Sequence, residues 1–172
     1  MKRSILLSLI SFSLTAGAQS RLEKEIVKEI NKFRVANGLD TVIYSAELSK
    51  ASHHHARWMS RTGQRSHEET HGTGGLKTLV LPVDRFKEYR VFENSFHGTN
   101  ENIAFAGECK NPVESAKDIV SAWSNSPGHR ENMLETSSKR VQLIIGISAY
   151  REPGNKSKLG HAIVMNLGAK IK

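Results

Sequence analysis

The sequence has a single cysteine, Cys109, among its 172 residues. One thiol cannot form an intrachain disulfide, so a disulfide framework is excluded and the fold must be stabilised by packing. Internal repeats and low-complexity linkers are also absent, and the length suits one domain with a core of its own. No motif places a base beside Cys109, and we interpret it as a partly buried structural thiol.

Beyond its N-terminus the chain lacks an apolar run long enough to cross a membrane. At the N-terminus, Lys2 and Arg3 precede an apolar run over 5–14 and small residues over 16–18. This order is typical of a secretory signal peptide that is cleaved before Gln19. We therefore expect 1–18 to be a signal peptide and 19–172 to form one domain, secreted or periplasmic. No cysteine follows the cleavage region, which argues against a lipoprotein anchor.

Acidic residues are fewer than basic ones, 17 against 25, and the formal net charge is +8. Removal of Lys2 and Arg3 with the leader lowers this charge to +6. The basic residues are scattered, and no basic run is interleaved with aromatic residues. This pattern predicts solubility rather than specific nucleic-acid binding, and an attraction to anionic surfaces stays open.

Hydrophobic periodicity predicts helices first and a β-hairpin last. Ser45 is a suitable cap for the second helix, and Gly63 is a suitable end. Asn111 and Pro112 are typical of the start of a later helix, in which Trp123 is a core residue. The expected helices cover 22–36, 46–61 and 113–123, and the expected extended segments cover 39–45, 101–106, 141–150 and 160–167. This order predicts the α+β class.

Two histidine-rich stretches resemble metal sites, but their geometry and surroundings argue against metal binding. Consecutive helix residues point about 100° apart, so His53, His54 and His55 cannot converge on one ion. We expect His55 to face the core with hydrogen bonds, and His53 and His54 to be exposed. Residues 67–71 match His-Glu-x-x-His, but the segment is polar and lies between glycines. A zincin needs both histidines on one face of a helix with apolar surroundings, so we do not assign that site.

The stretch Trp123–Leu134 is the most informative part of the chain. A Ser-Pro-Gly break ends one helix and opens another, with His129 in the opening turn beside unpaired backbone N–H groups. A histidine there is placed to face a cavity, and a solvated surface turn is the alternative. Two further stretches, Ser66–His67 and Glu101–Ala104, favour the first interpretation.

These stretches resemble the motifs of the CAP superfamily, the cysteine-rich secretory, antigen 5 and pathogenesis-related 1 proteins, in its cysteine-poor bacterial branch. Asn31–Arg34 and Leu48–Met59 complete the resemblance. It implies a three-layer α-β-α sandwich, in which a small, mainly antiparallel sheet is flanked by helices. It also implies that Asn31 and Arg34 tie the first helix to its neighbours. The resemblance implies one more helix start, at Leu81–Arg85, which leads towards Tyr89.

The resemblance implies a central polar cleft lined by His67, Glu101 and His129. These residues would bind a zinc ion through His67 and His129, with Glu101. The family's second glutamate follows a Trp-x-x pattern, where this chain has Ser126. We therefore expect weaker zinc binding, or none. The residues that remain open as a replacement for that carboxylate are Glu68, Asp84 and Glu131.

Three classes of function stay open at this stage. A non-catalytic extracellular binding module would hold a lipid, peptide or glycan in the cleft and its adjoining grooves. A hydrolase would use zinc, or acid–base chemistry by His67, Glu101 and His129, with Ser126 as a weaker candidate nucleophile. A structural envelope protein would use the cleft as a polar core. We expect a monomer, assign no role to residues 73–99, and interpret His97 as an exposed residue of a polar loop.

Overall fold

A computed structural model describes residues 19–91, 96–136, 141–154 and 159–171, and the expected signal peptide, 1–18, lies outside these residues. No helix within the described part is long and apolar enough to cross a membrane. The elements are α1 (Arg21–Ala36), β1 (Ile43–Tyr44), α2 (Ala46–Thr62), α3 (Pro82–Glu88), β2 (Phe96–Ala106), α4 (Pro112–Ser124), α5 (Pro127–Met133), β3 (Val141–Tyr150) and β4 (His161–Ile171).

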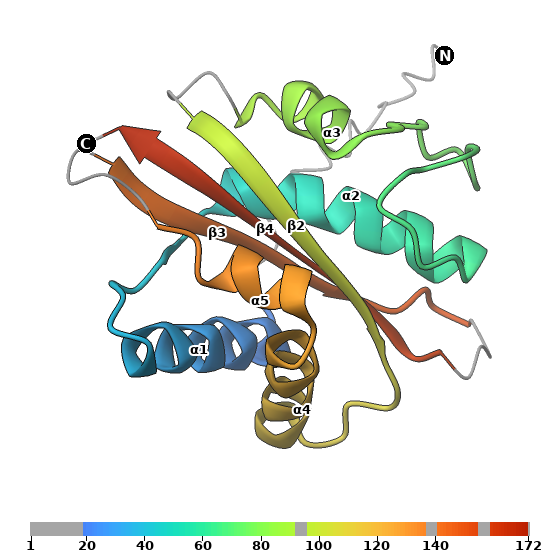
Figure 1. Cartoon of the computed structure of the whole chain (residues 1–172). Coiled ribbons are helices and arrows are strands. Elements are labelled where there is room, and N and C mark those ends of the chain that lie inside the picture. The colour runs from blue at the N-terminus through green and yellow to red at the C-terminus, as the bar shows by residue number, and fades with distance from the viewer. Residues whose placement is uncertain (1–18, 92–95, 137–140, 155–158, 172) are drawn as a thin grey trace, which may run out of the picture.

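Four strands form one sheet in the order β1-β3-β4-β2 (Figure 1). β3 and β4 pair antiparallel, which confirms the predicted hairpin, and β2 pairs antiparallel with β4 on the other side. β1 adds two residues parallel to β3. The sheet is therefore small and mainly antiparallel, with β2 as a long edge strand.

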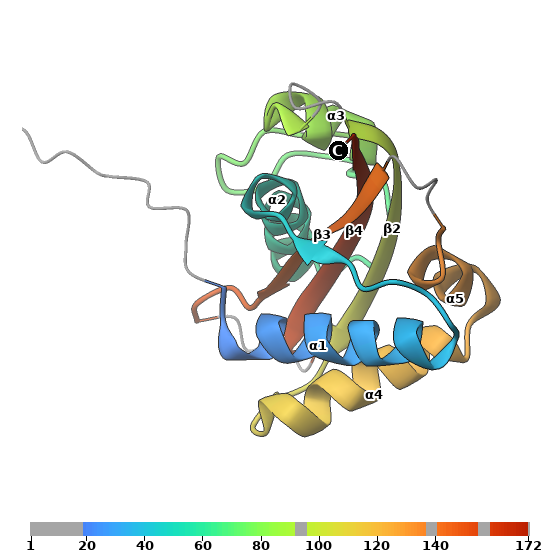
Figure 2. The same cartoon turned by 90° about the vertical axis from the view of Figure 1, so that its left-hand side faces the viewer.

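Helices cover both faces of this sheet (Figure 2). Side chains alternate along β4, so Val164 packs with Trp58 of α2 on one face. Met165 packs on the opposite face with Ile26 of α1 and Ile119 of α4. α3 lies against α2, and α5 continues from α4. This arrangement confirms the three-layer α-β-α sandwich.

Local signals set the ends of the helices as predicted. The Ser45 hydroxyl accepts a hydrogen bond from the Leu48 N–H at 3.2 Å and caps α2. Gly63 ends α2 in the left-handed conformation, with φ of 70°. The Asn111 side chain caps α4 by accepting from the Val113 N–H at 3.1 Å. Trp123, near the end of α4, is 2% exposed, so its assignment to the core is confirmed.

Asn31 and Arg34 have the structural role that the resemblance implies. The Asn31 amide exchanges two hydrogen bonds with the backbone of Val42. The Arg34 guanidinium donates to the Met133 carbonyl at 2.7 Å and to the Glu135 carbonyl at 2.9 Å. The buried Arg34 side chain therefore connects α1 to the end of α5.

Two expectations about extended segments need correction. β2 begins at Phe96 rather than at Glu101, so His97 belongs to a strand and not to a polar loop. Strand pairing with β4 extends β2 despite its polar composition, because backbone hydrogen bonds do not depend on side-chain hydrophobicity. The predicted exposure of His97 lies outside the described side chains.

Gly146 sets the closeness of α2 to the sheet and generates a stability prediction. A Cβ atom at this position would lie 2.5 Å from the Leu48 carbonyl carbon. Gly146→Ala should therefore lower the free energy of unfolding by at least roughly 2 kcal/mol, because backbone cannot yield as a side chain can. Urea unfolding checks this, with Gly107→Ala as the control, since its Cβ meets nothing within 4 Å. Equal stability of the two variants would contradict the prediction.

Candidate functional site

Glu101 is the centre of the candidate site and lies on the edge strand β2. Its side chain is 4% exposed, and its carboxylate accepts from His67 Nδ1 at 3.0 Å. Arg85 Nη2 donates to both carboxylate oxygens, at 3.0 and 2.9 Å. Burial alone raises the pKa of Glu101, but the His67 hydrogen bond and the Arg85 charge outweigh burial and lower it below its ordinary value. Glu101 is therefore a buried, ionised carboxylate with a hydrogen bond to each oxygen.

Glu69 is a second buried carboxylate in the same network. One oxygen lies 3.1 Å from His55 Nδ1, and the other accepts from the Leu79 N–H at 2.9 Å. Arg85 Nη1 lies 3.5 Å from Glu69, so one guanidinium is shared by two carboxylates. Burial raises the pKa of Glu69, but the hydrogen bonds from His54, His55 and Leu79 lower it to about 2.

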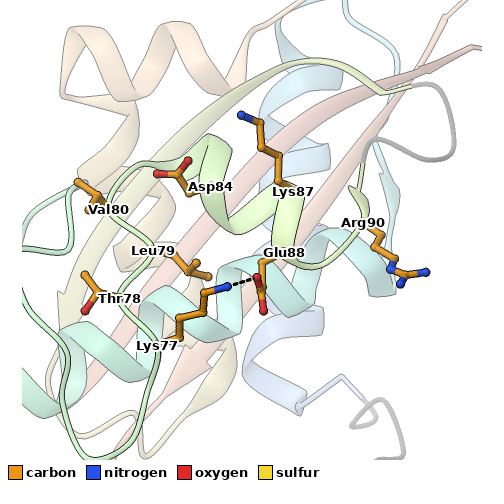
Figure 3. A pocket seen from close by; sticks show the side chains of 8 residues that line it. All are labelled: Lys77, Thr78, Leu79, Val80, Asp84, Lys87, Glu88 and Arg90. Carbon is orange, nitrogen blue, oxygen red and sulfur yellow. Dashed lines mark hydrogen bonds and ion pairs between the residues drawn. The ribbon is translucent and has the colours of Figure 1, made fainter.

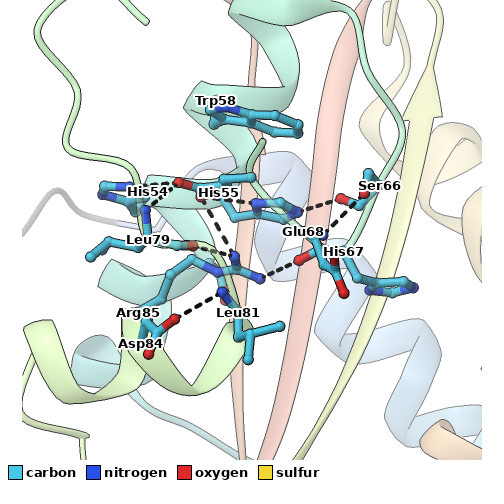
Figure 4. Close-up of polar contacts among 12 residues, drawn as sticks. His54, His55, Trp58, Ser66, His67, Glu68, Leu79, Leu81, Asp84 and Arg85 are labelled. Atoms are coloured by element: carbon cyan, nitrogen blue, oxygen red, sulfur yellow. Dashed lines mark hydrogen bonds and ion pairs between the residues drawn. The ribbon is translucent and has the colours of Figure 1, made fainter. Parts of the chain in front are cut away.

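Arg85 comes from α3 and is fully buried. Besides Glu101, it donates to the Leu79 carbonyl and to the His67 carbonyl, each at 3.1 Å (Figure 4). These contacts join α3, the segment that carries His67, and strand β2. Because Arg85 bonds the backbone of His67 and the carboxylate that holds the His67 ring, it determines where this histidine lies.

The histidines of α2 belong to this network rather than to a metal cluster. His55 is fully buried and bonds Glu69 and the Ser66 carbonyl, so its predicted core position is confirmed. His53 is exposed, as predicted. The prediction for His54 is wrong: it is 3% exposed and bonds the Tyr89 hydroxyl and the Lys77 carbonyl. Polar partners from the 73–91 segment, which has no readable pattern, make its burial favourable.

Residues 67–71 lie outside the helices, so they do not form the helical face that a zincin needs. The His67 ring bonds Glu101, whereas the His71 ring bonds the Thr70 hydroxyl. Between them, Glu69 turns inward to α2. The match to the zincin motif therefore lies in a connecting segment, in which His67, Glu69 and His71 each bond a different partner.

His129 and Ser126 form a second polar pair at the start of α5. His129 Nδ1 lies 2.9 Å from the Ser126 hydroxyl, which makes no cap hydrogen bond of its own. Burial lowers the pKa of His129, and the positive charge of His67 in its protonated form and that of Arg65 lower it further. The neutral form of the His129 imidazole is therefore favoured.

Hydrogen bonds donated by side chains connect α5 to the edge of β2 opposite β4. Asn132 Nδ2 donates to the Glu101 carbonyl at 3.2 Å and to Asn102 Oδ1 at 2.8 Å. Asn102 Nδ2 in turn donates to the His129 carbonyl at 2.9 Å. Glu101 faces α2 and α3, and Asn102 faces α5, because successive strand residues point to opposite faces. Through the neighbouring residues Glu101 and Asn102, His67 and His129 therefore contact the same strand from opposite faces of the sheet.

The residues present do not fit the zinc site that the resemblance implies. Both oxygens of Glu101 are bonded to a permanently charged guanidinium, which opposes a divalent cation beside it. Ser126, in place of the second carboxylate, contributes a neutral hydroxyl. Of the alternatives, Asp84 accepts from the Leu81 N–H and caps α3. In the described part of the chain, no three His, Cys, Asp or Glu side chains are grouped to hold a metal.

Two grooves lie beside these polar pairs. The first, about 650 Å³ in volume, runs along α3 (Figure 3) and is lined by Lys77, Thr78, Leu79, Val80, Asp84, Lys87, Glu88 and Arg90. The second, about 710 Å³, runs along the end of α4 and α5 and is lined by Ser124, Asn125, Pro127, Arg130, Glu131, Leu134, Glu135 and Thr136. Of the residues that line the first groove, Val80 is an exposed hydrophobic residue. The central cleft between the pairs stays a prediction.

Several residues of the site are missed by sequence reasoning. The motifs assign Arg85 only to a helix start, and Glu69 only to the rejected zincin match. Asn102 enters solely as part of Glu101–Ala104. One signal could have found these residues: several ionisable residues lie in the segments that carry the motifs, and a buried carboxylate needs a charged partner.

Comparisons with known proteins agree with this architecture. The model of the cysteine-rich secretory protein family, CAP, matches residues 27–167. An uncharacterized Bacillus subtilis protein, YkwD, is 32% identical over 122 residues, which are 71% of this chain and 41% of that protein. The chain therefore spans about two fifths of the length of this relative.

Solved structures share the fold. An outer surface protein of Borrelia burgdorferi is similar with a TM-score of 0.62 and 22% identity, over 91% of this chain and 97% of that one. An extracellular SCP-domain protein of Bacillus anthracis has a TM-score of 0.59 and 19% identity, over 87% of this chain and 40% of that one. At these identities the likeness shows the fold alone.

The low pKa of Glu69 predicts a specific loss of stability in acid. A carboxyl that titrates at about 2 when folded, against 4.5 ordinarily, stabilises the fold above pH 4.5, and this contribution disappears as the pH falls to 2. Glu69→Gln should remove about 3 kcal/mol of this pH dependence. Urea unfolding between pH 5 and 2 measures it, with exposed Glu108→Gln as control. The same slope in Glu69→Gln and wild type would contradict the assignment.

Proposed function

The chain belongs to the cysteine-rich secretory protein (CAP) family, and on this premise we propose that it is an exported, non-catalytic binding module. Its ligand is a lipid, peptide or glycan of the cell envelope or exterior. Similar folds in proteins described as outer surface or extracellular support the location. The signal-peptide pattern over 1–18 supports it independently.

The observation that carries the proposal is a preorganised polar pair beside exposed apolar side chains. The His67 ring is 49% exposed at its side chain, although buried Glu101 holds one of its nitrogens. A ligand can therefore reach His67 without displacing the buried network. Exposed Val80, whose carbonyl accepts from the Glu69 N–H two residues after His67, offers apolar contact in the first groove. Fixed polar groups with adjoining apolar surface are typical of ligand sites.

A hydrolase is the second candidate, favoured by the Glu101–His67 hydrogen bond. A carboxylate that orients a histidine is the arrangement of a general base. The Ser126–His129 pair is a poorer nucleophile site, because no carboxylate among the described residues bonds the His129 ring. A ligand-binding role needs neither a nucleophile nor a general base, so we place binding before hydrolysis.

Ligand binding by the mature protein, 19–172, tests the proposal. The probes are phosphatidylglycerol vesicles, soluble peptidoglycan fragments and a peptide library. Binding to one of these classes should weaken at least about tenfold in His67→Ala and in His129→Ala, because each removes a ligand hydrogen bond. His161→Ala is the control, since its ring lies at the start of β4 and makes only an exposed 3.5 Å contact.

The outcomes separate the three classes of function. Equal binding by wild type and both variants would contradict a site at this cluster. Conversion of a probe to products, lost in His67→Ala, would instead establish the hydrolase. Loss of folding in His67→Ala would support a structural role, although a half-exposed histidine should cost little stability when truncated.

A further inference from the structure

We propose that the Arg85 guanidinium is a built-in cation in the place of a divalent metal, so that the Glu101–His67 pair is a metal-free site for a ligand hydroxyl or amine. The inference concerns the ligand chemistry of the binding site proposed above and rests on that proposal for its biological meaning. Its physical basis is the set of contacts around three residues, Arg85, Glu101 and His67.

Arg85 makes the contacts to Glu101 that a bound cation would make. It reaches both carboxylate oxygens, at 3.0 and 2.9 Å, and it is fully buried. Glu101 also accepts from His67 Nδ1, and its backbone carbonyl accepts from Asn132. Arg85 therefore contacts both oxygens of the carboxylate. A divalent cation at Glu101 would lie beside a buried guanidinium that cannot lose its charge.

The burial of Arg85 is not explained by stability alone. Its Nε atom is buried without a hydrogen-bond partner among the described residues. Burying a guanidinium between Glu69 and Glu101 requires removing three charges from water, and well-packed apolar residues often stabilise a core as much. An incompletely bonded guanidinium at this position therefore indicates a role at the neighbouring site.

On the other side of the site, no carboxylate among the described residues is grouped with the two histidines to restore cation binding. Ser126 is bonded to His129 Nδ1 at 2.9 Å, and Asp84 is bonded to the Leu81 N–H at 3.0 Å. A cation would meet two imidazoles and no free carboxylate. Two neutral ligands beside Arg85 are a poor divalent site, since zinc sites in proteins have three or four protein ligands.

The hydrogen bonds also determine what His67 offers to a ligand. The ionised Glu101 carboxylate only accepts, so His67 Nδ1 carries the proton. In the neutral ring, Nε2 is then a bare acceptor on a side chain that is 49% exposed. A ligand at Nε2 must bring a donor. Hydroxyl and amine groups have that chemistry, and the hydroxyls of a glycan are one source.

Zinc calorimetry on residues 19–172 tests the replacement of the metal. Wild type should show no stoichiometric binding. Arg85→Gln, which frees the Glu101 carboxylate, should bind zinc at least about tenfold more tightly, and His67→Ala in that background should abolish the gain. Arg85→Lys keeps the cation and should behave as wild type. Stoichiometric zinc binding by wild type that is lost in His67→Ala would overturn the proposal.

Nitrogen NMR of the wild-type histidines keeps the test independent of whether Arg85 variants fold. At neutral pH, His67 should carry its proton on Nδ1, and an equimolar zinc salt should leave both ring resonances unchanged. Glu101→Gln should shift the proton toward Nε2, whereas Glu108→Gln should not. A wild-type proton on Nε2 would overturn the proposal.

The zinc and NMR measurements can contradict this inference without contradicting the proposed function, and the reverse also holds. If no ligand probe binds but zinc and the tautomer behave as expected, the role of Arg85 stands and the binding module is wrong. If a lipid whose headgroup has no hydroxyl or amine donor binds through His67, the binding module stands and the ligand chemistry inferred here is wrong.

Discussion

Two carboxylates, Glu69 and Glu101, are buried side by side with their shared partner Arg85. Their negative charges must be balanced by positive groups inside the protein. The Arg85 guanidinium lies between them and contacts both. Buried charges without such compensation would protonate or prevent folding. The position of α3 follows from this constraint, because Arg85 must reach from its helix to strand β2. The orientation of His67 follows as well, since Glu101 and Arg85 bond its ring and its backbone.

An edge strand makes this organisation possible. β2 has a neighbour on one side only, β4, so the backbone at its other edge can accept hydrogen bonds from side chains of α4 and α5. Asn132 of α5 and Trp123 of α4 donate to the carbonyls of Glu101 and Ile103. These bonds satisfy backbone groups that an exposed edge would leave available for aggregation. They also bring the His129 pair from one layer toward the His67 pair from the other.

Local signals in the sequence are sufficient for most helix ends and for the β-hairpin, whereas the three-layer arrangement was implied by the family resemblance. The Ser45 and Asn111 caps, the Gly63 stop and the alternation of β3 and β4 are all readable within short windows. The buried network was not readable, because its members come from segments without periodicity and meet only in three dimensions. His54 illustrates this: its partners, Tyr89 and Lys77, are 35 and 23 residues away in sequence. Motifs identified His67 and Glu101, but not the residue that connects them.

The central claim is that Arg85, and not a metal ion, compensates Glu101 beneath the candidate site. A crystal structure of residues 19–172 grown with a zinc salt, with anomalous data at the zinc edge, tests it most directly. The account predicts Arg85 across both oxygens of Glu101, and no anomalous peak within bonding distance of His67, Glu101 or His129. A zinc peak bonded to Glu101 and His67, with the Arg85 guanidinium displaced, would contradict it.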